Sequence, residues 1–291
     1  MSQKYCVLGL GIMGSRVSAR LAKNDYDVVG WNRTLGPNLD DLAKTVPLAS
    51  SPCEAVQDAD IILMFLHDGP AVRQVLIDNG VADCIKAGSL LADMGTNTPD
   101  EARFISSNIP QTIRFVDAPV SGGPKGAENA TMSIFLGSAQ KDLDLAKNAL
   151  GAVGRVTHMG DVGTGQAAKL ANQIIVACSI AGLGEGVAYA EALGIKAENL
   201  FSAMQGGLAD SEILQIMGPR IASGDFSPHG RAATHLKDLD CAFSQLEGVE
   251  EKLKATATAK NYLQKLVDGG EDLDHSAMVI AARAALAANT T

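Results

Sequence analysis

Short apolar runs alternate with amphipathic segments along the first half of the chain. The runs have the length of buried strands, and we predict strands at residues 5–9, 27–31, 61–66, 90–94, 115–118, 133–136 and, more weakly, 155–158. The amphipathic segments predict helices at residues 15–23, 71–78, 100–107 and 141–150. Near-continuous apolar strands separated by helices are typical of a parallel sheet that is covered on both faces.

The pattern changes after Gly165, where the strand signals end and the chain is predicted to be helical to its C-terminus. The first of these helices spans residues 166–193, a length of about 40 Å at 1.5 Å per residue. We interpret it as the element that joins an α/β domain, residues 1–163, to an all-α domain, residues 164–291. Residues 206–207 and 223–230 are predicted to be loops between later helices.

Composition narrows the class of protein. The formal net charge of −9 disfavours nucleic acid as a partner, because a phosphate backbone needs a basic surface. Five cysteines without C-x-x-C spacing predict reduced thiols rather than a disulfide framework or a zinc site, with Cys6 and Cys178 in the core. A strand pattern begins at once and no run of about 18 apolar residues is uninterrupted. We therefore expect no signal peptide, no membrane span and a cytoplasmic protein.

A glycine-rich turn separates the first predicted strand from the first predicted helix. Its residues are Gly9, Leu10, Gly11, Ile12, Met13 and Gly14. In this context G-x-G-x-x-G predicts the dinucleotide-binding turn of a Rossmann-type, doubly wound sheet. Gly9 makes the tight turn, Gly11 admits a pyrophosphate, and Gly14 allows close packing of helix on strand. The alternative is a glycine turn in an ordinary α/β domain.

The second predicted strand is followed by Asn32, Arg33 and Thr34. An NAD-binding domain usually has a carboxylate there, which accepts hydrogen bonds from the ribose hydroxyls. Arg33 can instead pair with a 2′-phosphate, while Asn32 and Thr34 can donate hydrogen bonds to it. The sequence therefore favours NADP(H) over NAD(H), with a solvated loop arginine as the alternative.

Two further strand ends should face the cofactor, because ligands bind at the carboxyl ends of strands in such sheets. Leu66 ends the third predicted strand and Thr96 follows the fourth. Thr96 can hydrogen-bond the nicotinamide or the substrate. Alternatively, this segment only starts a helix at Pro99, with Thr98 as its cap. We assign no chemistry to His67.

A second glycine turn, Ser121-Gly122-Gly123, follows the fifth predicted strand. Its hydroxyl and backbone N–H groups can form a small anion-binding nest that suits a carboxylate. The alternative is a plain turn before the next strand.

Lys169 lies near the start of the long helix and, at helical spacing, shares a face with Asn172 and Gln173. A lysine there can simply extend to water. Hydride transfer, however, needs a group that moves a proton at the carbonyl oxygen. A partly buried lysine with a lowered pKa can do this near neutral pH.

Five motifs in this order resemble the β-hydroxyacid dehydrogenase family over nearly the whole chain: GLGIMG, DMGTNTP, DAPVSGGPKGA, GTGQAAKLANQ and HLKDLDCA. The resemblance implies that Lys169 is the catalytic acid/base and that the Ser121-Gly122-Gly123 turn binds the substrate carboxylate. It implies that Thr96 contacts cofactor or substrate. Lys237 and Asp238 match the K-D pair of the family, and Lys237 is expected to reach the cofactor and the substrate.

We therefore expect an NADP(H)-dependent enzyme, without a metal, that interconverts a small β-hydroxyacid and its semialdehyde or keto acid. Many members have Asn four residues after the lysine, whereas this chain has Asn172 at three and Gln173 at four, so either amide can orient the substrate. The resemblance also implies a homodimer or homotetramer. The alternatives are a 6-phosphogluconate dehydrogenase-like enzyme, an imine reductase-like enzyme and a non-catalytic NADP(H)-binding sensor.

Overall fold

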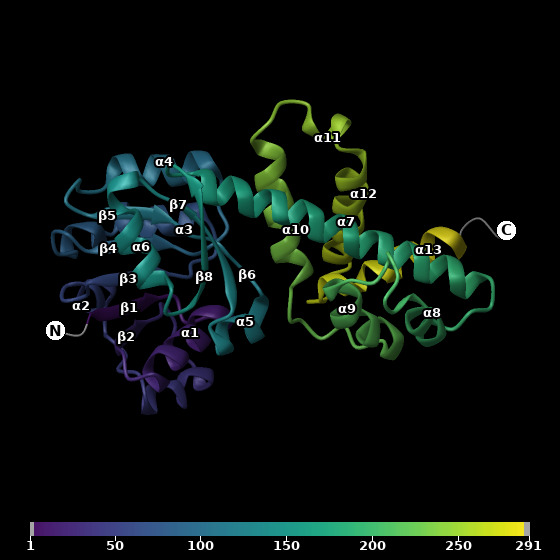
Figure 1. Ribbon diagram of the computed structural model, residues 1–291, viewed down its shortest axis with the longest axis horizontal. Helices are drawn as coiled ribbons and strands as arrows, with labels where there is room; N and C mark the ends of the chain where they lie inside the picture. The colour runs from purple at the N-terminus through teal and green to yellow at the C-terminus, as the bar shows by residue number, and fades with distance from the viewer. Residues whose placement is uncertain (1–2, 288–291) are drawn as a thin grey trace. The chain divides into compact units, whose positions relative to one another are not determined.

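The structure is a computed structural model that describes residues 3–287 and divides into two compact units, Met1–Lys169 and Leu170–Thr291. Figure 1 shows strands and helices in the first unit, and no strand among the described residues of the second. The strands are β1 (Lys4–Leu8), β2 (Asp27–Trp31), β3 (Ile61–Met64), β4 (Leu90–Asp93), β5 (Arg114–Asp117), β6 (Val120–Ser121), β7 (Met132–Gly137) and β8 (Gly154–Gly160).

The α-helices of the first unit are α1 (Ile12–Lys23), α2 (Pro52–Val56), α3 (Gly69–Arg73), α4 (Pro99–Asn108), α5 (Gly123–Asn129) and α6 (Leu143–Leu150). Shorter helical turns include η3 (Gln74–Asp78) and η4 (Val81–Cys84). The helix α7 (Thr164–Ala192) begins in the first unit and continues into the second. The second unit adds α8 (Ala197–Met204), α9 (Glu212–Ser223), α10 (Ala232–Ser244), α11 (Val249–Lys252), α12 (Lys254–Asp268), η6 (His275–Ala277) and α13 (Met278–Ala287).

The sheet has the order β2-β1-β3-β4-β5-β7-β6, and β8 pairs with β7. The first five strands are parallel, whereas β7 runs antiparallel to β5 and β6. The weakly predicted strand at residues 155–158 is β8, which pairs in parallel with β7 along its length. The predicted fold class, a Rossmann-type sheet followed by helices, is confirmed, although the sheet is mixed rather than wholly parallel.

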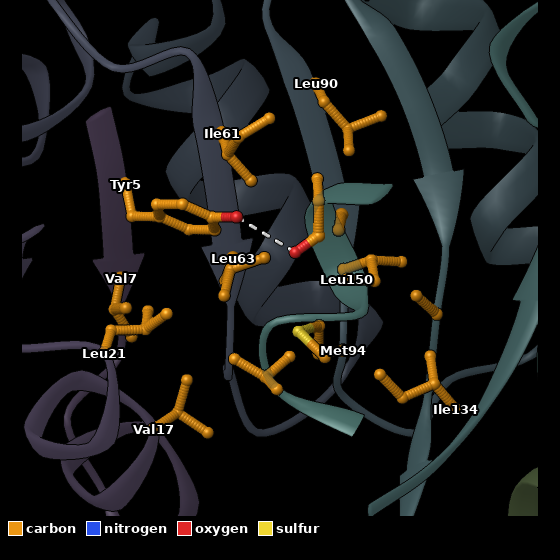
Figure 2. Packing of buried hydrophobic residues seen from close by; sticks show 14 of the residues in the cluster. Tyr5, Val7, Val17, Leu21, Ile61, Leu63, Leu90, Met94, Ile134 and Leu150 are labelled. Atoms are coloured by element: carbon orange, nitrogen blue, oxygen red, sulfur yellow. Dashed lines mark hydrogen bonds between the residues drawn. The ribbon is translucent and has the colours of Figure 1, made fainter. Parts of the chain in front are cut away.

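Alternate residues of the parallel strands enter two cores, one on each face of the sheet. In β1, Tyr5 and Val7 pack on the face covered by α1 and α6, whereas Cys6 and Leu8 pack on the face covered by α2 and α4. Because both faces are buried, these strands are apolar at nearly all of their interior positions. The Tyr5 hydroxyl donates to the carbonyl oxygen of Ala149 in α6 over 3.0 Å (Figure 2).

The prediction that the thiols are all reduced is wrong for two of them. Cys53 in α2 and Cys84 in η4 form a disulfide, with their Cα atoms 5.4 Å apart. The two cysteines are 31 residues apart in the chain, and only the packing of α2 beside η4 on one face of the sheet brings them together. Cys6 lies in the core as predicted, and burial raises the pKa of its thiol to about 12.

In the second unit, α7 packs against α10, α12 and η6 through an apolar cluster. By length and composition alone, α7 is also long and apolar enough to cross a membrane, with a mean hydropathy of 1.4 in its most apolar window. Counting uninterrupted apolar residues did not reveal this. The core helix of a soluble protein meets the same criterion, so this one helix is weak evidence for a membrane span.

Candidate functional site

The glycine turn joins the end of β1 to the start of α1. Gly9 has a φ of +92°, and a Cβ atom on it would lie 2.4 Å from the carbonyl oxygen of Phe65. A Cβ atom on Gly14 would lie 1.9 Å from the carbonyl oxygen of Gly9. A Cβ atom on Gly11, in contrast, would meet nothing within 4 Å. The fold therefore requires the first and third glycines, whereas the second one leaves open space beside the turn.

That open space lies at the N-terminus of α1. Gly11 is the N-cap residue, no side chain among the described residues caps the helix there, and its first turn holds no acidic residue. Backbone N–H groups at an uncapped helix N-terminus attract anions. The turn formed by Leu10, Ile12, Met13 and the three glycines therefore fits the pyrophosphate of a dinucleotide.

Asn32, directly after β2, supports this turn. Its side-chain oxygen accepts a hydrogen bond from the N–H of Leu10 over 2.9 Å, and its amide group donates to the carbonyl oxygen of Thr34 over 2.7 Å. Arg33 between them is exposed. Asn32 thus holds the glycine turn and the Arg33 loop together, a supporting role that its predicted contact with a phosphate did not include.

The ends of β3 and β4 lie beside each other. A Cβ atom on Gly95 would lie 2.7 Å from the carbonyl oxygen of Leu66, so the backbone after β4 approaches the backbone after β3 closely. Thr96 follows Gly95 and is half-buried. Thr98 caps α4 by accepting a hydrogen bond from the N–H of Glu101, which confirms the helix start at Pro99.

Gln166, in the first turn of α7, holds the loop after β4. Its side-chain oxygen accepts a hydrogen bond from the N–H of Asn97, and its amide group donates to the carbonyl oxygen of Gly95, each over 2.9 Å. Both partners are neighbours of Thr96. Because Lys169 lies three residues after Gln166, these bonds fix the start of its helix relative to Thr96.

A buried carboxylate also holds the start of α7. Asp117, the last residue of β5, accepts hydrogen bonds from the N–H groups of Gly163 and Gln166 over 2.7 and 2.8 Å. Burial raises the pKa of Asp117 to about 6, although these backbone bonds oppose the rise. Asp93, the last residue of β4, is also buried and accepts a hydrogen bond from the side-chain amide of Asn97 over 2.6 Å.

Lys169 is 7% exposed, although charged side chains are rarely buried to this degree. It is the last residue of the first unit, and the unbroken α7 places Asn172 and Gln173 on its face of the helix. This low exposure disfavours the alternative that the lysine simply extends to water.

The predicted anion nest consists of the last residue of β6, the linking residue Gly122 and the first residue of α5. Ser121 is the last residue of β6, where it pairs with Ser133 of β7, and was not predicted as part of a strand. Gly122 and Gly123 have φ values of +125° and +59° and are exposed. Their N–H groups, at the start of α5, remain candidates to hold a carboxylate.

The remaining candidates form a polar cluster in the second unit. The side-chain amide of Asn172 donates to the side-chain oxygen of Gln173 over 3.1 Å, and the amide of Gln173 donates to Asp238 over 2.5 Å. Lys237 forms an ion pair with Asp238 over 3.0 Å. The two amides that the sequence left as alternatives are thus linked, and Gln173 connects Asn172 to the K-D pair.

Sequence reasoning assigned no role to Gln166 or Asp117. Both lie within quoted motifs, and each is a polar residue with apolar neighbours in sequence, within four residues of a candidate site residue. That combination was a usable signal, because a buried polar side chain is retained only where hydrogen bonds satisfy it.

Two family models match the chain. Residues 4–160 match the NAD binding domain of 6-phosphogluconate dehydrogenase, and residues 163–282 match the NAD-binding domain of NADP-dependent 3-hydroxyisobutyrate dehydrogenase. The chain is 33% identical to 2-hydroxy-3-oxopropionate reductase of Escherichia coli, over 95% of this chain and 96% of the relative. It is 32% identical to a probable 3-hydroxyisobutyrate dehydrogenase-like protein of Arabidopsis thaliana, over 94% of this chain and 83% of the relative. A solved structure of Mycobacterium tuberculosis 3-hydroxyisobutyrate dehydrogenase with L-serine is similar, with a TM-score of 0.84, 29% identity and coverage of 97% of this chain and 100% of that one.

Proposed function

Because the chain belongs to the β-hydroxyacid dehydrogenase family and is an oxidoreductase with NAD(P)-binding domains, we propose that it interconverts a small β-hydroxyacid and its semialdehyde or keto acid with NADP(H). One observation carries the proposal. Lys169 is buried on a helix whose first turn is bonded, through Gln166, to the loop that contains Thr96. A lysine buried this far has a function that a solvated lysine lacks.

The cofactor is proposed to lie along the glycine turn. Gly11 leaves room for the pyrophosphate, Arg33 pairs with the 2′-phosphate, and Leu66 and Thr96 line the nicotinamide end. When bound, the nicotinamide supplies or accepts the hydride. The exposed guanidinium and the absence of a carboxylate at the end of β2 support NADP(H) over NAD(H).

Lys169 is proposed to handle the proton. In reduction, its ammonium donates a proton to the substrate oxygen as the carbonyl carbon receives the hydride; in oxidation, its neutral amine takes that proton back. This role requires Lys169 to exchange a proton with the substrate oxygen, as a lysine in general acid–base catalysis does. Ser121 with the N–H groups of Gly122 and Gly123 holds the substrate carboxylate.

Asn172 and Gln173 are proposed to orient the substrate beside Lys169. Lys237, which forms an ion pair with Asp238, is the remaining residue proposed to bind the substrate. The enzyme is also proposed to be a cytoplasmic homodimer or homotetramer, as the family resemblance implies. Size-exclusion chromatography with light scattering tests the oligomeric state.

The test is the rate of NADPH and NADH oxidation with glyoxylate and the semialdehydes of tartronate, methylmalonate and succinate. We expect turnover of at least one acid, a preference for NADPH, and a loss of at least a hundredfold in kcat for Lys169→Ala. Lys141→Ala, at an exposed position, is the matched control. Binding of NADPH without turnover of any acid would instead support the sensor or the imine reductase alternative, and reduction of NADP+ with 6-phosphogluconate would support the 6-phosphogluconate dehydrogenase alternative.

A further inference from the structure

Two histidines of the second unit, neither of which was a candidate residue in the sequence analysis, lie in direct contact. His235 of α10 is 3% exposed, and its Nδ1 atom lies 3.0 Å from the Nδ1 atom of His275 in η6. The other ring nitrogen of His235, Nε2, lies 3.1 Å from the carbonyl oxygen of Gln173. The pair therefore connects η6 to α7 at a residue of the proposed site.

When both rings are neutral, these distances determine which nitrogens carry protons. A carbonyl oxygen only accepts, so Nε2 of His235 donates to Gln173. The Nδ1 atom of neutral His235 is then an acceptor, and Nδ1 of His275 must be the donor in the contact between the rings. A proton on both Nδ1 atoms would set two N–H groups against each other, so the contact requires that one Nδ1 atom be unprotonated, and in the neutral pair that atom is Nδ1 of His235.

The position of His275 is itself fixed. The neighbouring Asp274 is fully buried, forms an ion pair with Arg220 over 3.0 Å, and accepts hydrogen bonds from the N–H groups of His229 and Gly230 over 3.0 and 2.7 Å. The His275 ring lies against Gly230, where a Cβ atom would come within 2.8 Å of the ring.

α10 therefore holds Gln173 at two points. His235 binds its backbone carbonyl, and Asp238, three residues later, binds its side-chain amide. Gln173 in turn accepts a hydrogen bond from the amide of Asn172. Loss of the His235 contact would remove one of the two bonds from α10 to Gln173, the residue whose side chain holds the amide of Asn172.

We propose that His235 and His275 are positioning residues that set the orientation of Asn172 and Gln173 toward the substrate. The inference rests on the proposed function and assigns neither histidine a contact with substrate or cofactor. Loss of the donor on His275 removes one of the contacts that fix the His235 ring, and the orientation of the two amides is then less well defined.

The experiment compares His275→Phe, which keeps a ring without a donor, with His275→Asn, whose amide nitrogen can replace Nδ1. Kinetics with the preferred acid should give roughly a tenfold or greater rise in KM for His275→Phe, since small misplacements of orienting groups have such effects. The Kd for NADPH should not change, and His275→Asn should recover most of the loss. His229→Phe, at an exposed histidine of the neighbouring loop, is the control. Gly230→Ala, which crowds the His275 ring without altering either histidine, should reproduce the rise in KM.

A second readout needs no turnover. In ¹⁵N NMR of the whole protein, His235 should be the Nε2–H tautomer, and the side-chain NH₂ signals of Asn172 and Gln173 should shift in His275→Phe and return in His275→Asn. The proposal would be overturned by the Nδ1–H tautomer at His235. It would also be overturned if His275→Phe changed neither the NH₂ signals of Asn172 and Gln173 nor the KM. If His275→Phe does not fold, the wild-type tautomer and the Gly230→Ala variant decide it. If no acid is turned over, the proposed function fails, and the NMR result still decides whether the pair orients the amides.

Discussion

Gln166 and Asn97 are 69 residues apart in the chain, and the backbone N–H of Asn97 donates to the side-chain oxygen of Gln166 over 2.9 Å. The same side chain donates to Gly95. One glutamine thereby satisfies the backbone on both sides of Thr96, and it lies on the helix that carries Lys169. The geometry between the proposed acid/base and the loop after β4 depends on this side chain.

Replacing Gln166 with Met keeps the length of the side chain and removes both hydrogen bonds. We expect kcat/KM to fall by roughly ten- to a hundredfold, because the loop and the lysine lose their fixed relation. Steady-state kinetics measures this, with Gln264→Met at an exposed position of α12 as the control. Equal activity in the two variants would show that the loop is held by other contacts.

The glycine turn offers a matched pair of substitutions. Gly11→Ala adds a Cβ atom to open space and should change the free energy of unfolding of the cofactor-free protein by less than about 1 kcal/mol. It should weaken NADPH binding at least tenfold, because the methyl group occupies the proposed place of the pyrophosphate. Gly14→Ala sets its Cβ atom against the carbonyl of Gly9 and should lower the unfolding free energy by about 3 kcal/mol or more. Urea unfolding and calorimetric titration measure the two effects, and tight NADPH binding by Gly11→Ala would argue against this cofactor position.

Arg33→Ala should weaken the binding of NADPH but not the binding of NADH. A charge-assisted hydrogen bond contributes about 1.5–3 kcal/mol, so the Kd for NADPH should rise roughly ten- to a hundredfold while the Kd for NADH stays the same. Fluorescence titration with each nucleotide measures this, with Arg155→Ala at another exposed arginine as the control. Similar losses with both nucleotides would place the role of Arg33 elsewhere than at the 2′-phosphate.

The raised pKa of Asp117 predicts a pH dependence of stability. An unfolded aspartate titrates near pH 4, whereas Asp117 in the native protein titrates near pH 6 because burial disfavours its charge. Between these values the native state holds a proton that the unfolded state has released, so the free energy of unfolding falls as the pH rises from about 4 to about 6.

Urea unfolding of the wild type and of Asp117→Asn across this range tests the sign. The asparagine does not titrate, so the stability of the wild type relative to the variant should fall by on the order of 2–3 kcal/mol between pH 4 and pH 6.5 and then remain constant. Asp144→Asn, at an exposed position of α6, provides the reference variant. A difference that rises with pH would mean that the backbone hydrogen bonds to Asp117 outweigh its burial.

Local patterns were sufficient to predict seven of the eight strands and several of the helices, although not α2 or α5. Each of the seven predicted strands overlaps an observed one, because a strand buried on both faces is largely apolar, as Tyr5 to Leu8 are. β6 was missed because two residues, Val120 and Ser121, carry no period. Its strand character comes only from pairing with β7.

Local patterns could not predict contacts between residues that are far apart in the sequence. The Cys53–Cys84 disulfide and the bonds of Gln166 depend on which elements lie side by side, and no spacing in the sequence encodes that. Asn32 shows the same limit. Its position after the second strand was predicted, but its hydrogen bond to the N–H of Leu10 follows from the adjacency of β1 and β2.

The uninterrupted course of α7 through Lys169 and Asn172 constrains how the length of the chain can vary during evolution. One inserted or deleted residue between these positions would turn everything beyond it by about 100° around the helix axis and shift it by about 1.5 Å. The amides would then face away from the lysine. A loop such as residues 205–211 absorbs a change of length locally, so insertions are expected there and excluded from the segment between Gln166 and Gln173.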